Sequence, residues 1–414
     1  MSRLLHTSDW HLGHSLYGHT REEDFDAVLA EIVDIARESR PDLIVHSGDL
    51  FHTSRPTVLD LLRAMCALYE LCDVAPTVVV AGNHDSPGYF EFLNLVSGPS
   101  RGKGLFFVDR VRSARETVFS FDACGGKQRI RLAAMPFVHP NRFWPASFTS
   151  GMTPADYAEG MRGLQAELME ALREGYDPDR DVLLFAAHVY IAGTTRSPSE
   201  RAVHEALEVP AADLPEVSYV ALGHIHRPGP VPPGLASAAH YAGSPLPMDF
   251  GEANDAKSVV IVDADPGRQA KPTPRRLSSG RRLANFTGTL EELKAASAQY
   301  DGTFLKADIT SEEPGTLLTR EVSEIVPKAI LVGPVRARGE AADAALDEVP
   351  DDEPDLPDAF RAYLEREGMS SAAAAPTVSA FTQLLNEIDD ETPSLTPVEE
   401  QLRIALSDTW TEAS

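Results

Sequence analysis

The stretch Arg3–Gly13, RLLHTSDWHLG, carries the two features on which the fold assignment depends. Arg3–Thr7 is typical of a β-strand, and a polar cluster begins just beyond it at Asp9. A helix predicted over Arg21–Arg37 and a second strand over Asp42–Ser47 complete a strand–helix–strand unit. Units of this kind imply a parallel sheet with right-handed crossovers. The beginning of the chain therefore predicts an α/β fold.

The same alternation continues along the chain. The first helix has its apolar residues at helical spacing, and Thr20 with Glu23 has the pattern of a capping box at its start. A second amphipathic helix is predicted over Pro56–Cys72, and the valine-rich strand Thr77–Ala81 has the composition of a strand covered on both faces. Further strands are predicted near Glu116–Phe121, Arg129–Ala133, Val182–Ala186, Tyr219–Leu222, Ala239–Ala242 and Ser258–Val262, with a helix over Pro154–Glu174.

The composition changes near residue 264. Asp265–Arg282 is rich in Pro, Gly, Arg and Ser and is predicted to be a linker, whose arginines we interpret as solvated rather than as a DNA clamp. After it, a small α/β domain is predicted from Thr289–Gln299, Phe304–Ile309, Leu317–Ile325 and Ala329–Val332, alternating helix and strand. Residues 340–358 are acidic, and short amphipathic helices are predicted at Ala359–Glu367, Val378–Ile388 and Pro397–Thr409. We therefore predict three parts: 1–264, 283–339 and 340–414.

Bulk composition fits this organisation. With 414 residues, 43% hydrophobic and 24% charged, the chain resembles an ordinary globular protein of two or three domains. No apolar run approaches the ~20 residues of a membrane helix. The N-terminus has no signal-peptide pattern, and Cys66, Cys72 and Cys124 form no CxxC motif. These features predict a cytoplasmic protein without disulfide bonds.

The chain is strongly acidic, with a formal net charge of −26 at pH 7. Residues 340–414 contain 19 Asp and Glu against three Arg, so they carry −16 of this charge, and residues 1–339 carry −10. No broad basic surface can therefore drive binding to nucleic acid. If the chain acts on DNA, bound cations or a partner protein must supply positive charge, and affinity without the partner should be weak and salt-sensitive.

Five short polar clusters each lie at the end of a predicted strand. Ligand sites in open α/β sheets form at the carboxyl ends of strands. Each cluster alone is more often an ordinary turn or a core histidine, but five of them in this arrangement indicate a metal site. The clusters are Asp9-Trp10-His11, Gly48-Asp49-Leu50-Phe51-His52, Gly82-Asn83-His84-Asp85, Ala187-His188 and Gly223-His224-Ile225-His226.

Two carboxylates, one amide and four imidazoles in these clusters can act as ligands, and no thiolate is among them. This donor set suits Mn²⁺ above all, with Fe²⁺ or Zn²⁺ possible, and argues against a structural zinc site. A pair of cations ~3.5–4 Å apart needs a bridging anion, and Asp49 is the only carboxylate of its cluster. Asp9 and His11 are two residues apart, as are His224 and His226, so in an extended strand each pair would share a face.

Other residues of these clusters have simpler interpretations. Asp85 is not needed as a ligand, and Trp10 and Phe51 are expected to pack in the core. The glycines that precede Asp49, Asn83 and His224 allow tight turns and close approach of the backbone. Of the remaining histidines, His6 and His46 are expected inside strands, and five are expected in loops or on the surface: His14, His19, His139, His204 and His240.

The order of these motifs resembles that of the calcineurin-like metallophosphoesterases. The strings LHTSDWHLG, HSGDLFH, GNHDSPGYF, YVALGHIHRP and YAGSPLPMDFGE narrow the resemblance to the SbcD-type nucleases, which are similar to the eukaryotic double-strand-break repair nuclease. It covers residues 3–262 and continues more weakly through FTGTLEEL in the small domain. Ala187 stands where many relatives have glycine, and the acidic tail matches no motif.

The resemblance implies a site with two divalent metal ions, for which Mn²⁺ is expected. His84 matches the family's catalytic histidine, which contacts the scissile phosphate, and His52 matches a second histidine that positions the phosphodiester. One metal would be held by Asp9, His11, Asp49 and His226, and the other by Asp49, Asn83, His188 and His224.

The fold implied by the resemblance is a two-sheet αββα sandwich with a small α/β capping domain and a helical C-terminal tail. The tail would bind a coiled-coil ATPase of the SbcC type. The implied activities are ATP-dependent exonuclease cleavage of double-stranded DNA and endonuclease cleavage of single-stranded and hairpin DNA, in repair and recombination. The implied assembly is a homodimer within a heterotetramer, nucleoid-associated and not bound to a membrane.

Two alternatives stay open on the residues alone. The first is a metallophosphodiesterase or phosphatase for small molecules, which would not need residues 283–410 and would hydrolyse a nucleotide monoester faster than DNA. The second is a metal-free scaffold on a degenerate phosphoesterase fold, which would be expected to have lost some of the seven ligands. The motif chemistry does not distinguish a phosphodiester from a phosphomonoester.

Overall fold

The fold is described from a computed structural model that places residues 1–97, 104–111, 113–139, 154–195, 197, 208–231, 237–311, 315–332 and 336–337. Contacts divide the chain into two units, Met1–Gly339 and Glu340–Ser414, and all of the described residues belong to the first. The three helices predicted in the tail lie outside the described residues. In the part of the chain that is described, no helix combines the length and the apolar character that crossing a bilayer requires.

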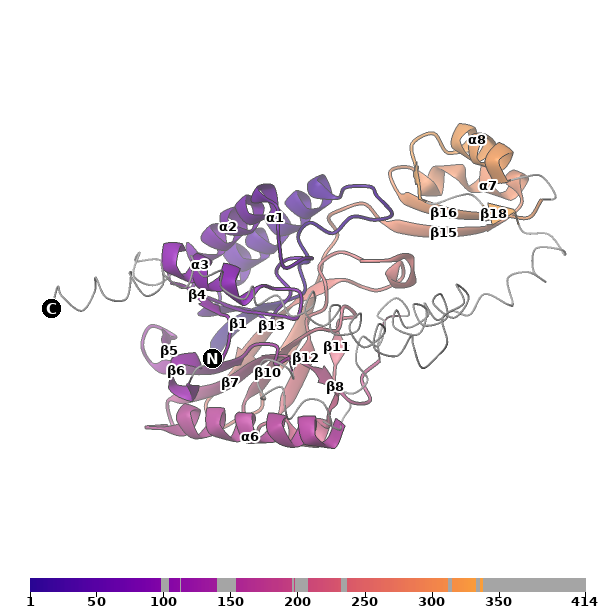
Figure 1. Ribbon diagram of the computed structural model, residues 1–414. Coiled ribbons are helices and arrows are strands. Elements are labelled where there is room, and N and C mark those ends of the chain that lie inside the picture. The colour runs from indigo at the N-terminus through magenta and orange to yellow at the C-terminus, as the bar shows by residue number, and fades with distance from the viewer. Residues whose placement is uncertain are drawn as a thin grey trace, which may run out of the picture. The chain divides into compact units, whose positions relative to one another are not determined.

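A six-stranded sheet holds the first three motif clusters. Its strand order is β14-β13-β1-β2-β3-β4, in which β1, β2, β3 and β4 are parallel and β13 runs antiparallel to β1. Helices α1, α2 and α3 cover its outer face (Figure 1). The elements are β1 (Ser2–Thr7), α1 (Glu22–Ser39), β2 (Leu43–His46), α2 (Val58–Cys72), β3 (Thr77–Val80), α3 (Pro87–Ser97), β4 (Leu105–Val108), β13 (Ser258–Ala264) and β14 (Lys271–Arg276).

A second six-stranded sheet packs against the inner face of the first, and α6 covers its outer face (Figure 1). Its order is β11-β12-β10-β7-β6-β5. The αββα sandwich predicted from the sequence is therefore confirmed. Its elements are β5 (Val118–Ala123), β6 (Gln128–Met135), α6 (Pro154–Arg173), β7 (Asp181–His188), β10 (Tyr219–Gly223), β11 (Gly229–Pro230) and β12 (Ala238–Tyr241), beside a separate pair β8 (Tyr190–Ile191) and β9 (Glu208–Val209).

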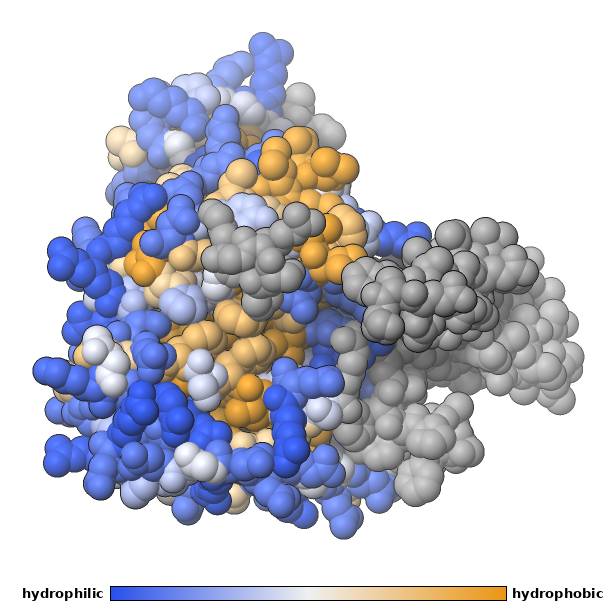
Figure 2. All heavy atoms as spheres, turned by 90° about the vertical axis from the view of Figure 1, so that its left-hand side faces the viewer, coloured by the Kyte–Doolittle hydropathy of each residue, from blue (hydrophilic) through white to orange (hydrophobic). Residues whose placement is uncertain are grey.

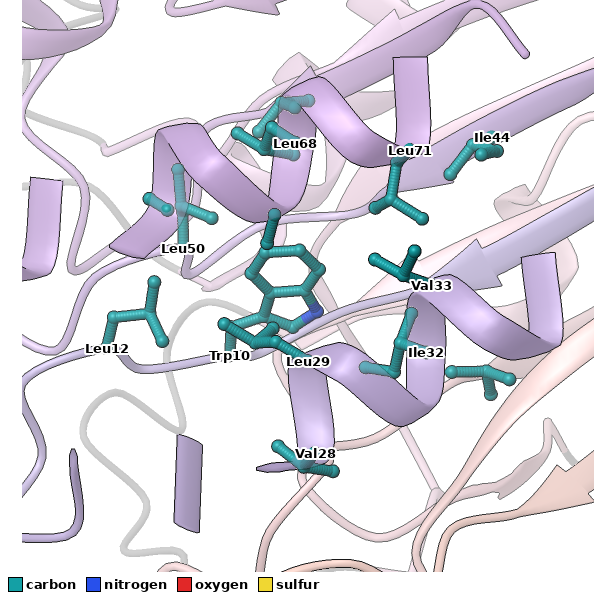
Figure 3. Close-up of a cluster of buried hydrophobic side chains, with 14 of the residues drawn as sticks. Trp10, Leu12, Val28, Leu29, Ile32, Val33, Ile44, Leu50, Leu68 and Leu71 are labelled. Atoms are coloured by element: carbon teal, nitrogen blue, oxygen red, sulfur yellow. The ribbon is translucent and has the colours of Figure 1, made fainter. Parts of the chain in front are cut away.

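The core under α1 and α2 explains why the first strand–helix–strand unit folds as it does. The apolar stripe of α1 is buried, and Trp10 lies fully buried among side chains from both helices (Figure 3). The Trp10 indole N–H donates to Thr7 Oγ1 at 2.8 Å, so the ring is also held by a hydrogen bond. Phe51 is buried in the same cluster. The expectation that Trp10 and Phe51 pack in the core is confirmed.

After the sandwich, a four-stranded sheet with two helices follows within the same unit. Parallel strands β15 (Leu283–Gly288), β16 (Phe304–Ile309) and β17 (Ile330–Leu331), with β18 (Arg336–Ala337) beside β16, carry α7 (Leu290–Ala296) and α8 (Gly315–Ile325). A capping box of Thr289 and Glu292 begins α7. Phe304 joins this unit to the sandwich: the guanidinium carbons of Arg21 and Arg281 lie 5.8 and 4.8 Å from its ring centroid.

Three local predictions are wrong. Helix α1 begins at Glu22 with Arg21 as its N-cap, and Arg21 cannot cap the helix because its side chain has only donors. The buried Arg21 side chain donates instead to the carbonyl oxygen of Pro247. The predicted linker contains β14, an edge strand that tolerates its two prolines because an edge strand needs only one row of hydrogen bonds. His240 lies buried in β12 rather than at the surface. The sequence pattern also gave no indication of α3, β4 and β15.

Candidate metal centre

The motif residues come together where strands of the two sheets end. Strands β1, β2, β3 and β10 stop at Thr7, His46, Val80 and Gly223, and His188 is the last residue of β7. The clusters after these strands converge from both sheets onto one place. The structure thus brings together all nine side chains predicted for the site: Asp9, His11, Asp49, His52, Asn83, His84, His188, His224 and His226.

The backbone of this site differs from the sequence expectation. Asp9 and His11 do not leave an extended strand: their φ angles are +50° and +47°, in the left-handed region. Asp49 and His224 also have positive φ, at +54° and +103°. Such angles are unfavourable for residues with a Cβ and cluster at functional sites. The argument that residues two apart share a face of a strand is therefore wrong here, because tight loops rather than strands carry the side chains.

Three glycines make this convergence possible. A Cβ on Gly48 would run into the imidazole of His188, and one on Gly82 would meet the carboxylate and backbone nitrogen of Asp49. A Cβ on Gly223 would meet the carbonyl oxygen of Ser47. The expectation that these glycines permit close backbone approach is confirmed.

Replacing Gly82 with alanine should damage the site, because no flexible neighbour can make room for the methyl group. We expect Gly82→Ala to lower the free energy of unfolding by about 1–3 kcal/mol and to weaken Mn²⁺ binding. Gly88→Ala is the matched control, because its Cβ would meet nothing closer than Ser86 Oγ at 3.8 Å. Urea denaturation and Mn²⁺ titration of both variants test this. Equal behaviour of the two variants would mean that the Gly82 loop has room to adjust.

One group of ligand-type atoms comes from Asp9, His11 and His226, whose donor atoms all lie within 4.8 Å of one another. His11 Nε2 is 3.0 Å from His226 Nε2 and 3.6 Å from Asp49 Oδ2. Asp9 also accepts the backbone N–H of His224 at 3.1 Å, which ties the β1 loop to the β10 loop. Asp9 and His11 are buried, and His226 is only partly exposed.

A second group comes from Asp49, Asn83, His188 and His224. His188 Nε2 lies 3.0 Å from Asn83 Oδ1 and 3.3 Å from Asp49 Oδ2. His224 Nδ1 lies 2.9 Å from the same Asn83 oxygen. Since Asp49 Oδ2 is near both His11 and His188, this carboxylate stands between the two groups.

The donor set fits divalent cations. Lone-pair nitrogens and oxygens ~3 Å apart are spaced like adjacent ligands about 2.1 Å from one ion. A hydrogen bond between His11 Nε2 and His226 Nε2 would need a proton on one of the two rings, and His11 Nδ1 is buried with no hydrogen-bond partner among the described residues. A cation held by both Nε2 atoms would satisfy this close pair of nitrogens without a proton between them.

Burial shapes the protonation of these groups. It raises the pKa of Asp9 to about 6, with Asp49 adding to the effect and His188 opposing it. For Asp49 burial also favours the neutral acid, but the neighbouring His188 and His84 outweigh it and hold the pKa of Asp49 well below its usual range. In turn, Asp49 overcomes the burial of His188 and raises the pKa of that imidazole to about 9. Of the two ligand-type carboxylates, Asp49 is therefore the one favoured as an anion.

A third set of imidazoles borders the two groups. His84 and His52 have nearly parallel rings with centroids 5.7 Å apart, and His84 Nδ1 is 2.9 Å from the carbonyl oxygen of His52. The backbone N–H of His84 donates to Asp49 Oδ1 at 2.9 Å. His14, expected only in a loop, packs edge-on against His52 with ring centroids 4.7 Å apart. This set lies beside the ligand groups and is partly open to solvent.

Two buried carboxylates that support the site were not predicted from the sequence. Asp85 accepts the backbone N–H groups of Leu50, Phe51 and Gly82 at 3.1, 3.0 and 2.9 Å, so it joins the β2 and β3 loops. Glu252 accepts from His226 Nδ1 at 3.1 Å. Asp85 could have been found as the last residue of the GNHD motif, whereas Glu252 had no signal beyond its place in the string YAGSPLPMDFGE.

Comparisons with known proteins show which family this chain resembles. A family described as "Calcineurin-like phosphoesterase" matches residues 2–228. A protein of Bacillus subtilis (strain 168), named as the D component of the nuclease SbcCD, is 29% identical over 413 residues, which cover 94% of this chain and 99% of that relative. The Escherichia coli (strain K12) protein of the same name is 27% identical, covering 75% and 78%.

Among solved structures, TT1561 of Thermus thermophilus aligns with a TM-score of 0.39 at 16% identity, covering 66% of this chain and 98% of that one. The family match spans more than half of the chain and includes every predicted site residue. The chain belongs to the calcineurin-like phosphoesterase family.

Proposed function

We propose that this chain is the nuclease subunit of an SbcCD-like complex and cleaves phosphodiester bonds of DNA with two divalent ions, Mn²⁺ in the first place. The observation that carries the proposal is the convergence of seven ligand-type side chains from two sheets around the carboxylate of Asp49. The relatives named as components of the nuclease SbcCD, one of which aligns over 94% of this chain, support the choice of DNA over a small phosphoester.

In this proposal Asp9, His11, Asp49 and His226 hold one cation, and Asp49, Asn83, His188 and His224 hold the other. The cations would supply Lewis acidity at phosphorus and neutralise the charge that develops there. His84 would contact the scissile phosphate and donate a proton to the leaving oxygen. His52, which lies beside His84, would orient the phosphodiester.

The acidity of the chain supports a role for partners in holding DNA. Residues 1–339 carry a net charge of −10, so contacts to phosphates would be few without the cations or a second protein. We propose that a coiled-coil ATPase of the SbcC type provides that second protein and that double-stranded, single-stranded and hairpin DNA are substrates. Residues 283–339 would cap the site, and residues 340–414 would bind the ATPase.

A homodimer is also proposed. Helix α2 exposes Val58, Leu59 and Leu62, and α3 exposes Phe92 and Leu95, each with more than half of its surface accessible. Figure 2 shows apolar surface on the side of the molecule where α3 lies. Exposed apolar surface of this kind is typical of protein interfaces, and most homo-oligomers of soluble proteins are twofold dimers.

The deciding experiment is cleavage of hairpin DNA by the full chain in the presence of Mn²⁺, with and without the ATPase from the same source. We expect Mn²⁺-dependent nicking by the chain alone and ATP-stimulated cutting of duplex ends by the complex. Faster hydrolysis of a nucleotide monoester than of any DNA would replace this proposal with a small-molecule phosphoesterase.

Removal of residues 345–414 separates the two roles proposed for the chain. The truncated protein should still cut single-stranded DNA with Mn²⁺, because every proposed ligand lies before residue 227. It should no longer co-purify with the ATPase, and ATP should no longer stimulate duplex cutting, because the short amphipathic helices predicted there would be the docking elements. Pull-down and nuclease assays measure both. Full affinity of the truncated chain for the ATPase would place the docking surface elsewhere.

A further inference from the structure

Glu252 is a fully buried carboxylate next to the metal centre, at the end of the short 3-10 helix Phe250–Glu252. Its Oε1 lies 3.1 Å from His226 Nδ1. Its Oε2 accepts the backbone N–H of Met248 at 3.0 Å and the ammonium group of Lys257 at 2.6 Å. The carboxylate thus faces two donors on one side and one ring nitrogen of His226 on the other.

Lys257 is itself buried and has a second connection to His226. Its Nζ donates to the carbonyl oxygen of His226 at 2.9 Å and to Ser244 Oγ at 2.8 Å. The backbone N–H of Ser244 donates to the same His226 oxygen at 3.1 Å. The imidazole and the main chain of His226 are therefore both held by one buried polar group, formed by Glu252, Lys257 and Ser244.

We propose that Glu252, neutralised by Lys257, is a positioning residue that keeps the proton of His226 on Nδ1 and directs the bare Nε2 at the cation shared with Asp9 and His11. The inference rests on the proposed metal centre and adds a residue to it that lies outside the motif clusters. It explains why a buried carboxylate contacts the ring of His226 at Nδ1, while His226 Nε2, the other ring nitrogen, is the atom that lies 3.0 Å from His11 Nε2.

The energetics agree with this role. A buried carboxylate is costly unless it is paired and hydrogen-bonded, and here His226 Nδ1, the Met248 N–H and the Lys257 ammonium group surround it. A carboxylate held by the Lys257 ammonium group at 2.6 Å and the Met248 N–H at 3.0 Å presents an acceptor to His226 Nδ1. An acceptor at Nδ1 leaves a neutral imidazole with only Nε2 free to bind a cation.

Glu252→Gln is a nearly isosteric test of this idea. The amide oxygen of the glutamine would turn to the two donors, Lys257 Nζ and Met248 N–H, so that its NH₂ group would face His226 Nδ1. That arrangement makes Nδ1 an acceptor and moves the imidazole proton to Nε2, where it blocks the cation. The variant should therefore weaken the binding of only that ion which His226 helps to hold.

Calorimetric titration of the full-length chain with Mn²⁺ measures this effect. We expect two equivalents of Mn²⁺ to bind to the wild type. In Glu252→Gln the affinity for one equivalent should fall by about 10–100-fold, and the affinity for the other should not change. The control is Asp181→Asn, which removes another fully buried carboxylate, paired with Arg129 at the opposite end of β7 from His188. It should lower thermal stability and leave both equivalents unchanged.

Other results would overturn the inference. If Glu252→Gln binds both equivalents as the wild type does, or loses both to the same extent, Glu252 acts only in stability. A wild type that binds no Mn²⁺ would instead remove the proposed metal centre, so the two failures are distinct.

A second measurement needs no change at Glu252 and covers the case in which the variant does not fold. In metal-free wild type with ¹⁵N-labelled histidine at mildly alkaline pH, the His226 signal, assigned with His226→Gln, should show the proton on Nδ1. A bare Nδ1 would overturn the inference.

Discussion

Replacing Asp49 with asparagine should abolish Mn²⁺-dependent cleavage, with a loss of at least about 10³-fold, because metal ions contribute several kcal/mol to such reactions. Asp49 Oδ2 lies 3.6 Å from His11 Nε2 and 3.3 Å from His188 Nε2, so its charge faces both ligand groups. The asparagine keeps the size of the side chain and an oxygen for the backbone N–H of His84. What it removes is the negative charge that Asp49 places between the two groups.

Metal titration and hairpin cleavage should be measured on the same preparation of Asp49→Asn. The affinity for both equivalents of Mn²⁺ should fall, whereas Glu252→Gln is expected to lower the affinity for only one. Asp181→Asn again serves as the control for loss of a buried carboxylate, and it should cleave at the wild-type rate. Cleavage at the wild-type rate by Asp49→Asn would show that the two metal ions are assigned to the wrong residues.

The residues that gather at the candidate site could be predicted because the ends of the strands can be located in the sequence. Each of the five clusters ends a short apolar run, and parallel strands place their carboxyl ends at one edge. Asp9, Asp49, Asn83 and His224 could therefore be expected together although they are up to 215 positions apart. The αββα sandwich followed from the resemblance in the same motifs, since nothing in the strand pattern alone assigns strands to two sheets.

The geometry of the loops could not be predicted in the same way. Positive φ at Asp9 and His11 could not be predicted from the sequence, because Asp and His adopt it more often than most residues but still only at a small fraction of their positions. The backbone N–H groups of Asp9 and His11 donate to the carbonyl oxygens of Gly48 and Asp49, and these hydrogen bonds form only once the two loops have come together. Glu252 was missed for a related reason: its partner His226 is 26 residues away, and only the folded chain shows that the carboxylate meets the imidazole.

Local rules also failed where a side chain had a tertiary partner. Thr20 and Glu23 match a capping box, yet α1 starts one residue later than that pattern requires, because Arg21 turns inward between the sandwich and Phe304. The Pro- and Arg-rich segment expected to be a linker became an edge strand, where Arg275 meets Glu38 at 3.1 Å. In both cases a long-range contact outweighed local propensity.

His84→Ala should separate metal binding from chemistry. The backbone N–H of His84, not its side chain, donates to Asp49 Oδ1 at 2.9 Å, so removing the imidazole leaves the proposed bridge in place. Both equivalents of Mn²⁺ should bind as in the wild type. Turnover should fall by about 10²–10⁴-fold, the usual contribution of a general acid or base. Calorimetry and single-turnover cleavage of hairpin DNA give the two quantities.

His19→Ala is the matched control for this variant, because His19 is an exposed imidazole outside the three sets of ligand-type groups. It should retain both metal affinity and rate. Loss of one Mn²⁺ equivalent in His84→Ala would make His84 a ligand rather than a proton donor, and an unchanged rate would remove it from the chemistry. The predicted pattern is full metal content with little turnover. Loss of a metal ligand would lower the metal content instead. Loss of a structural residue would lower the stability of the metal-free protein as well.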